Sequence, residues 1–133
     1  MRYLLDTNAI ISLLNDRAGN LALRARRHEP GELCISSIVM HELYYGAFKS
    51  QRSERNAALV DELRFEVLDY DREDAREAGA IRSQLAAQGQ TIGPYDILIA
   101  GQAKARGLIL VTHNTGEFNR VPGLSVEDWQ SGG

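Results

Sequence analysis

The 133-residue sequence predicts an α/β fold: a three-layer α/β/α sandwich with a central, mainly parallel sheet. Short apolar segments of strand length alternate with longer amphipathic segments of helix length. Capping residues stand where the strands pass into helices, and glycine or proline ends several segments. The chain is long enough for one hydrophobic core and too short for two ordinary domains, so we expect residues 1–133 to form a single domain.

Local signals fix the expected elements of the first half. Asp6, Thr7 and Asn8 can cap a helix that follows the first apolar strand. Pro30-Gly31 breaks a second helix, and Ser36-Ser37 caps a third. The expected elements are a strand at 2–5, helices at 9–15 and 16–27, a strand at 33–36 and a helix at 38–49.

The second half continues the alternation. Gly89 ends one helix, Pro94 takes the first position of the next, and Gly107 closes that helix before a strongly apolar strand. The expected elements are helices at 53–64 and 72–88 around a short edge strand at 65–68, then a helix at 95–106 and a strand at 108–112. In such a fold, ligands bind at the carboxyl ends of the strands.

Composition narrows the class of protein. Hydrophobic residues make up 44% of the chain and charged residues 25%, as in ordinary soluble proteins. No apolar run reaches the roughly 18 to 20 residues of a membrane span, so we expect a cytoplasmic protein. The single cysteine, Cys34, excludes an internal disulfide and a Cys-rich zinc site, and we expect it to be buried. The net charge of −3 does not indicate a nucleic-acid binder.

Four carboxylates and one amide occupy informative positions. Asp6 directly follows the first strand, and Asp96 lies in the first turn of an apolar helix. Glu42 lies in a helix that is otherwise nearly free of charge, where a buried carboxylate needs a partner or a cation. Asn114 and Glu117 follow the last predicted strand. All five can reach one site at the carboxyl edge of the sheet.

Each residue also has an ordinary structural explanation. Asp6 can be a helix cap, and Asn114 can cap a short turn. Asp96 can interact favourably with the positive end of the helix dipole. Glu42 can lie on an exposed stripe beside an arginine, and Glu117 can be solvated. His113 lies beside the expected site, where a surface histidine is the simplest interpretation.

Convergence of these acids would imply a metal ion. Several carboxylates at short range repel one another by several kcal/mol unless a cation lies between them. Oxygen ligands without cysteine or paired histidine favour Mg²⁺, with Mn²⁺ as the alternative. The matching chemistry is metal-dependent hydrolysis of a phosphodiester bond. Phosphate-loop, HExxH and nucleophile-elbow motifs do not occur in the sequence.

Four sequence blocks, in this order, resemble the signature blocks of VapC-type toxins of the PIN-domain ribonuclease family. They are LLDTN at 4–8, SSIVMHELYYGA at 36–47, GPYDILIAGQA at 93–103 and LVTHNTGEFNRVPGL at 110–124. The resemblance spans essentially the whole chain. It implies a small α/β/α sandwich that cuts RNA, pairs as a homodimer and is silenced by a VapB-like antitoxin. The Gly-Pro-aromatic-Asp block resembles the tRNA-cleaving group, which implies cleavage in a tRNA anticodon loop.

The resemblance also assigns residues. Asp6, Glu42 and Asp96 take the positions of the family's three invariant acids. The fourth position is Asp in many PIN domains and is Asn114 here, with Glu117 as the nearby acid. We expect Glu117 to contact the metal through a water molecule and Asn114 to act as a neutral helper.

Three other functions remain open at this point. A haloacid-dehalogenase-like phosphatase would use Asp6 as nucleophile, but Asn8 stands where that family has a second aspartate. A signalling receiver would be phosphorylated on Asp6, but it needs further acids before that residue. A catalytically inactive PIN domain would serve only as a binding module. Metal-dependent cleavage of RNA, compared with phosphate release from a small phosphomonoester, separates these functions.

One helix also predicts an assembly. Val39, Tyr44, Tyr45 and Phe48 exceed what a small core readily absorbs. We therefore expect some of them to line a homodimer contact.

Overall fold

A single five-stranded parallel sheet forms the centre of the computed structural model, which describes residues 2–131. The strand order is β3-β2-β1-β4-β5, and every neighbouring pair is parallel. The strands are β1 (Tyr3–Leu5), β2 (Leu33–Ser36), β3 (Glu66–Leu68), β4 (Ile109–Val111) and β5 (Val126–Glu127). Leu4 of β1 is in register with Cys34 on one side and Leu110 on the other. The predicted α/β fold class is confirmed.

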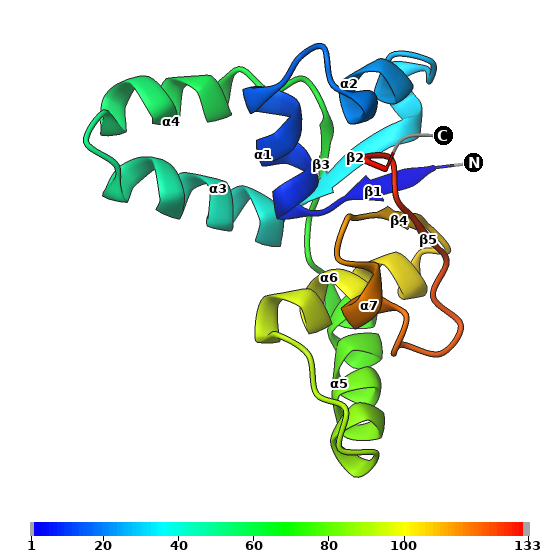
Figure 1. Ribbon diagram of the computed structural model, residues 1–133. Helices are drawn as coiled ribbons and strands as arrows, with labels where there is room; N and C mark the ends of the chain where they lie inside the picture. The colour runs from blue at the N-terminus through cyan, green and yellow to red at the C-terminus, as the bar shows by residue number, and fades with distance from the viewer. Residues whose placement is uncertain (1, 132–133) are drawn as a thin grey trace.

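Helices cover both faces of this sheet (Figure 1). The first group consists of α1 (Thr7–Asn15), α2 (Asn20–Ala25), α3 (Ser37–Lys49) and α4 (Ser53–Asp61), with a 3₁₀ turn at Pro30–Glu32. The second group consists of α5 (Arg72–Ala87), α6 (Pro94–Ala105) and the short α7 (Thr115–Phe118). Figure 1 shows the first group above the sheet and the second below it, with α3 and α4 projecting to one side.

Most expected elements occur, but one expected helix is shorter than predicted and one strand was missed. The helix expected at 16–27 is confined to Asn20–Ala25, because Asp16–Gly19 form a turn in which the Gly19 N–H donates to the Asp16 carbonyl at 3.3 Å. Strand β5 was not expected at all. It is two residues long, so it carries no alternating pattern, and its place depends on pairing with β4.

The core lies on both sides of β1 and β4. Leu4, Leu5, Leu110 and Val111 are completely buried. On the lower face, α5 packs closely on α6: a Cβ on Gly101 would lie 2.6 Å from the Ala78 Cβ, so this crossing requires glycine. The core therefore holds β1 and β4 side by side, and residues that follow these strands are brought to one edge.

Local contacts at the strand ends orient the following helices. Asp6 caps α1, and its backbone N–H also donates to the Val111 carbonyl at 3.1 Å. Ser36 caps α3, its Oγ accepting from the Ile38 N–H at 3.1 Å. Gly107, with φ of +64°, ends α6 in a conformation that favours glycine and leads into β4. The capping roles predicted for Asp6 and Ser36 are confirmed.

Burial corrects part of the expected homodimer surface. Val39 is completely buried in the core, and Tyr44 is half-buried with its hydroxyl bonded to the Asp61 carboxylate. The core thus absorbs two of the four residues. Tyr45 and Phe48 remain exposed, at 62% and 65%.

The remaining expectations concern single features. Cys34 is buried, as expected. Within residues 2–131, none of the helices is long and apolar enough to cross a membrane.

Candidate active site

Asp6 lies at the carboxyl end of β1, buried to 4% exposure. Its Oδ1 accepts the Ala9 N–H at 2.8 Å, and the Thr112 side chain also hydrogen-bonds its carboxyl group. Burial raises the pKa of Asp6, and the charge of Glu42 adds to the rise. The capping role of Asp6 accounts for one of its carboxylate oxygens. A helix cap does not need to be buried beside a second acid, so capping alone does not explain the position of Asp6.

Glu42 projects from α3 and is half-buried. The Thr7 hydroxyl donates to its Oε1 at 2.7 Å. The alternative of an arginine partner is wrong for this structure, because no ion pair among residues 2–131 includes Glu42. Among the described residues, its recorded side-chain partner is therefore the neutral Thr7 hydroxyl.

Asp96 lies in the first turn of α6, half-buried, as the sequence predicted. Burial raises its pKa to about 6, together with the charges of Glu117, Asp6 and Glu42. The four acids are therefore close enough to affect one another's ionisation. The structure brings them together from the end of β1 and from α3, α6 and α7, at the carboxyl edge of β1 and β4.

Glu117 lies on α7 and faces the start of α6. Its Oε1 accepts the Gly93 N–H at 3.0 Å, and its Oε2 accepts the Asn114 side-chain amide. The Gly93 N–H, followed by Asn114, lowers the pKa of Glu117. Asn114 is exposed and makes no side-chain cap for α7, so its amide holds Glu117 instead of the helix end.

Gly93 is a residue whose role sequence reasoning missed. It was interpreted only as a break before the helix. A Cβ at Gly93 would lie 3.3 Å from Asp96 Oδ2 and 4.0 Å from Glu117 Oε1. Glycine therefore lets both carboxylates approach the backbone, and it donates its N–H to one of them. Thr7 and Thr112 were missed as well; their only sequence signal is adjacency to acids or to strand ends.

His113 is a surface residue whose side-chain partner is not one of the four acids. It is exposed, and its Nδ1 lies 3.0 Å from an Asp128 carboxylate oxygen. The surface interpretation is confirmed.

The donor set fits a hard cation, although the side chains do not enclose one. Carboxylate and amide oxygens are the ligands of Mg²⁺ and Mn²⁺. Among the described residues 2–131, no three His, Cys, Asp or Glu side chains lie close enough to hold one ion as they stand. The pKa of Asp96 shows that the acids still interact through their charges. Mg²⁺ keeps several waters and takes few direct carboxylates, so such an open arrangement suits it.

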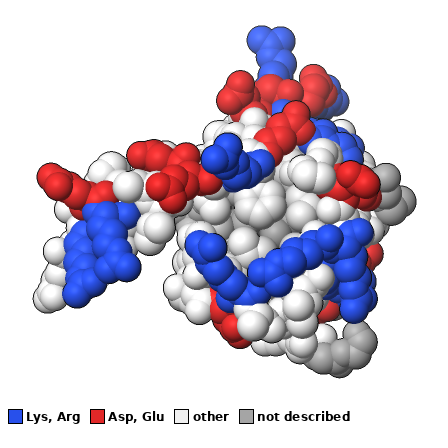
Figure 2. Space-filling model, turned by 90° about the horizontal axis from the view of Figure 1, so that it is seen from above, with Lys and Arg blue, Asp and Glu red and all other residues white. Residues whose placement is uncertain are grey.

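Two hollows lie away from the acids. One of about 630 Å³ lies between α5 and the start of α6, and is mainly apolar. The other, of about 840 Å³, lies between α1, α2 and α4, with Arg17, Arg26 and Arg64 among its lining residues. Figure 2, the view from above, shows Lys and Arg side chains beside a largely uncharged surface. Neither hollow is lined by Asp6, Glu42, Asp96 or Glu117.

Comparison with known proteins identifies the family. The PIN domain family model matches residues 3–124. The chain belongs to the PIN-domain family. Its curated relatives are of the VapC type: the "tRNA(fMet)-specific endonuclease VapC" of Shigella flexneri is 47% identical and aligns over 97% of this chain and 98% of its own. "Ribonuclease VapC2" of Haemophilus influenzae is 42% identical with the same coverage.

Solved structures place this PIN domain in the same VapC-type group. A chain in the crystal structure of DNA-bound VapBC from Salmonella typhimurium superposes with a TM-score of 0.92 at 45% identity, covering 97% of this chain and 98% of that one. A chain of VapBC2 from Rickettsia felis, bound to a promoter DNA fragment, gives a TM-score of 0.90 at 34% identity, with 97% and 99% covered. The expected PIN-like sandwich is confirmed.

Proposed function

We propose that this VapC-type PIN protein is a Mg²⁺-dependent endoribonuclease and the toxin of a type II toxin–antitoxin pair. The observation that carries the proposal is the proximity of Asp6, at the end of β1, to Glu42, Asp96 and Glu117 on three helices, close enough to raise the pKa of Asp96 to about 6. An uncompensated cluster of this kind is costly without a cation. The names of the relatives add nuclease activity to that electrostatic argument.

Each residue has a role in the proposed site. Asp6, Glu42 and Asp96 would hold the metal, and Glu117 would contact it through a water, with Asn114 keeping Glu117 in position. When bound, Mg²⁺ lowers the pKa of water and neutralises charge that develops on the phosphate. Thr7 and Thr112 orient Glu42 and Asp6, as partners of metal-ligating carboxylates commonly do. Mn²⁺ would bind the same oxygens.

The proposed substrate is RNA, and specifically tRNA cut in the anticodon loop, in the cytoplasm. Support comes from the Shigella flexneri and Salmonella typhimurium relatives, both named tRNA(fMet)-specific endonucleases, at 47% and 45% identity. An anticodon loop offers unpaired nucleotides, and exposed single strands are the form of RNA whose phosphodiester bonds a surface site can reach.

The proposed partners are a VapB-like antitoxin and a second copy of this chain. The relatives from Salmonella typhimurium, Rickettsia felis and Haemophilus influenzae were crystallised as VapBC, which supports an antitoxin partner. For the homodimer, the exposed ring of Phe48 is the support that remains from the original four residues. Large exposed aromatic side chains are typical of contact surfaces.

Cleavage of end-labelled tRNA by the purified protein tests the proposal. We expect cleavage with Mg²⁺, none with EDTA, and none by Asp96→Asn, which keeps the side-chain volume and removes the charge that holds the ion. Asp69→Asn is the matched control, because Asp69 is exposed and only its carbonyl makes a hydrogen bond. Undiminished cleavage by folded Asp96→Asn would remove Asp96 from the site. Phosphate release from p-nitrophenyl phosphate without RNA cleavage would favour a phosphatase, and no activity on either substrate an inactive binding module.

A further inference from the structure

Two aromatic rings come from residues that directly precede two of the acids in the sequence. His41 precedes Glu42 on α3, and Tyr95 precedes Asp96 on α6. Their ring centroids are 5.4 Å apart at an interplanar angle of 50°. His41 is exposed, and Tyr95 is 44% exposed although it is a large ring. The two rings therefore bridge α3 and α6 at the rim of the acidic cluster and remain accessible to a ligand.

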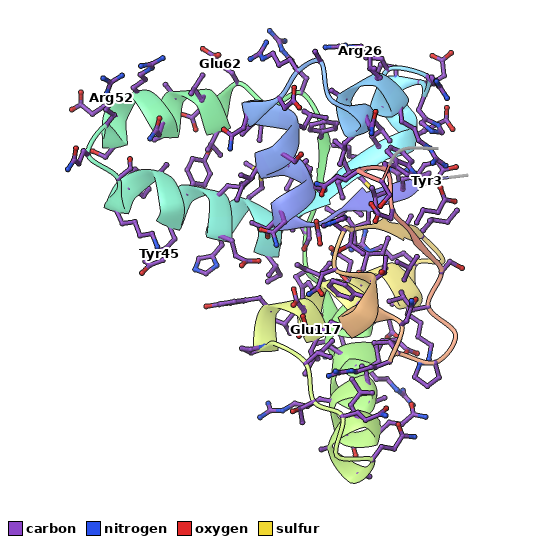
Figure 3. The ribbon with its side chains drawn as sticks, in the orientation of Figure 1. Tyr3, Arg26, Tyr45, Arg52, Glu62 and Glu117 are labelled. Atoms are coloured by element: carbon purple, nitrogen blue, oxygen red, sulfur yellow. The ribbon has the colours of Figure 1, made fainter. Side chains whose placement is uncertain are left out.

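The aromatic surface continues along α3. Tyr45 stands one helical turn beyond His41 and is 62% exposed. The Lys49 ammonium lies 4.9 Å from the centroid of its ring. Figure 3 shows Tyr45 beneath α3, on the side toward α6. We call Tyr95, His41, Tyr45 and Lys49 the aromatic strip.

The strip contributes little to the core. Val39, Leu43 and Ala47 bury the opposite face of α3, and neither Tyr45 nor Tyr95 is among the side chains packed against the core. Exposed rings in a row beside a phosphodiesterase site match the way proteins hold single-stranded nucleic acid, with bases stacked on aromatic faces and a cation on the backbone.

Lys49 supplies a positive charge that can contact the RNA backbone, which the acids repel. It lies seven residues along α3 from Glu42, which is about 10 Å at the helical rise. At that separation it would contact a phosphate other than the one held at the acids. A cation there also offsets the repulsion between the acidic cluster and the RNA backbone.

We propose that the aromatic strip is the substrate subsite for unpaired nucleotides flanking the cut phosphodiester: Tyr95 and His41 stack on a base next to the site, and Tyr45 and Lys49 hold the next nucleotide. This inference rests on the proposed ribonuclease function and deepens it. Recognition by stacking tolerates many bases, so the subsite selects unpaired RNA over paired RNA rather than one sequence.

Binding of a short single-stranded RNA tests the proposal separately from cleavage. The probe is a fluorescein-labelled oligonucleotide with one 2-aminopurine, whose fluorescence is quenched on stacking. All variants carry Asp96→Asn and are measured with Mg²⁺, so that the RNA stays intact. We expect Tyr95→Leu, which keeps bulk and removes the ring, to weaken binding about tenfold and to lose the quenching. Tyr95→Phe, which keeps the ring, should retain both.

Matched controls make each result decisive. Leu23→Ala changes a side chain of similar exposure, 49%, on α2 and should bind normally. Tyr45→Ser removes a second ring of the aromatic strip, on α3, and we expect it to weaken RNA binding about fivefold. Binding and quenching unchanged in both Tyr95→Leu and Tyr45→Ser would overturn the proposal, as would equal losses in Tyr95→Leu and Tyr95→Phe. Lost RNA binding that merely follows lost self-association in sedimentation would also overturn it, making the strip a protein contact.

The two proposals fail in different ways. If the unmodified protein with Mg²⁺ leaves RNA intact, the proposed function fails whatever the strip does. If RNA is cut normally by Tyr95→Leu and Tyr45→Ser in the otherwise unmodified chain, the function stands and the subsite is wrong. Cleavage weakened at low RNA concentration and restored at high concentration supports the subsite, because a binding defect is overcome by substrate.

Discussion

Asp96 and Glu117 approach the same backbone position: a Cβ at Gly93 would lie 3.3 Å from Asp96 Oδ2 and 4.0 Å from Glu117 Oε1. The Gly93 N–H and the Asn114 amide stabilise the charge of Glu117 and lower its pKa. Burial and three neighbouring carboxylates raise the pKa of Asp96 to about 6. The surroundings therefore move the pKa values of the two carboxyl groups in opposite directions. A bound cation would favour the charged form of both.

The stability of the metal-free protein should depend on the charge of Asp96. An aspartate in the unfolded chain loses its proton near its ordinary pKa of 3.8, whereas folded Asp96 keeps it up to about pH 6. The folded state binds more protons in this window, so the contribution of Asp96 is fully present below about pH 3.8 and is lost as the pH rises through 6.

Asp96→Asn therefore removes the loss of folding stability that Asp96 causes as the pH rises. We expect the variant to be more stable than the unmodified chain at pH 7.5 in EDTA, by about 1 to 2 kcal/mol after allowance for solvent screening at a half-buried group. The two proteins should have similar stability near pH 4. Urea denaturation from pH 4 to 8 measures both, with Asp69→Asn as the control. A variant less stable at pH 7.5 contradicts the proposed repulsion.

Glu42→Gln should leave the unfolding free energy of the metal-free protein unchanged, or raise it by up to about 1 kcal/mol. The glutamine oxygen can still accept the Thr7 hydroxyl, while the repulsion felt by the other acids is relieved. Thermal unfolding in EDTA measures this, beside Glu54→Gln, an exposed control on α4. A loss of more than about 2 kcal/mol would mark Glu42 as a structural residue.

Glu117 and Asn114 should differ in their effect on catalysis. Glu117→Gln removes the charge that would act on the metal, so we expect RNA cleavage at fixed Mg²⁺ to fall by about 10- to 100-fold, with partial recovery at higher Mg²⁺. Asn114→Ala removes one hydrogen bond to Glu117, and we expect less than about a tenfold loss. Mg²⁺ titrations of the cleavage rate compare them. The reverse order would make Asn114 the fourth ligand.

Phe48→Glu should weaken the proposed homodimer. Phe48 is the most exposed large hydrophobic side chain of the described residues, at 65%, and a charge buried in a contact without a partner is costly. Sedimentation equilibrium at tens of micromolar should show a shift toward monomer, while Leu23→Glu on α2 should leave the association unchanged. If the unmodified protein is strictly monomeric at that concentration, the homodimer proposal is wrong.

The antitoxin should inhibit by placing a basic side chain among Asp6, Glu42, Asp96 and Glu117. This cluster is strongly negative without a full complement of metal, and an arginine can engage two carboxylate oxygens at once. Alanine in place of that antitoxin residue should restore much of the RNA cleavage while the complex stays associated through apolar contacts. Calorimetric affinity and cleavage rate, measured together, check this. Complete inhibition by the alanine variant would show that the antitoxin instead buries or distorts the site.

Local patterns in the sequence determined the α/β class and most element positions. Asp6 and Ser36 were identifiable as caps, and the apolar segments at β1, β2 and β4 as strands, because these signals depend on residues within a few positions of one another. The same holds for Asp96 in the first turn of α6. The expected grouping of the acids came from the rule that the carboxyl ends of parallel strands meet at one edge of the sheet, and the family resemblance supported it.

Only the tertiary structure decided which side chains face one another. Strand β5 forms because β4 offers an open edge, and Val39 is buried because α3 lies against the sheet on that face. The short α7 brings Glu117 to the Gly93 N–H, and packing of α3 near α6 sets His41 beside Tyr95. These contacts join residues 24 to 54 positions apart, and their energies depend on distance in space, which a local pattern does not contain.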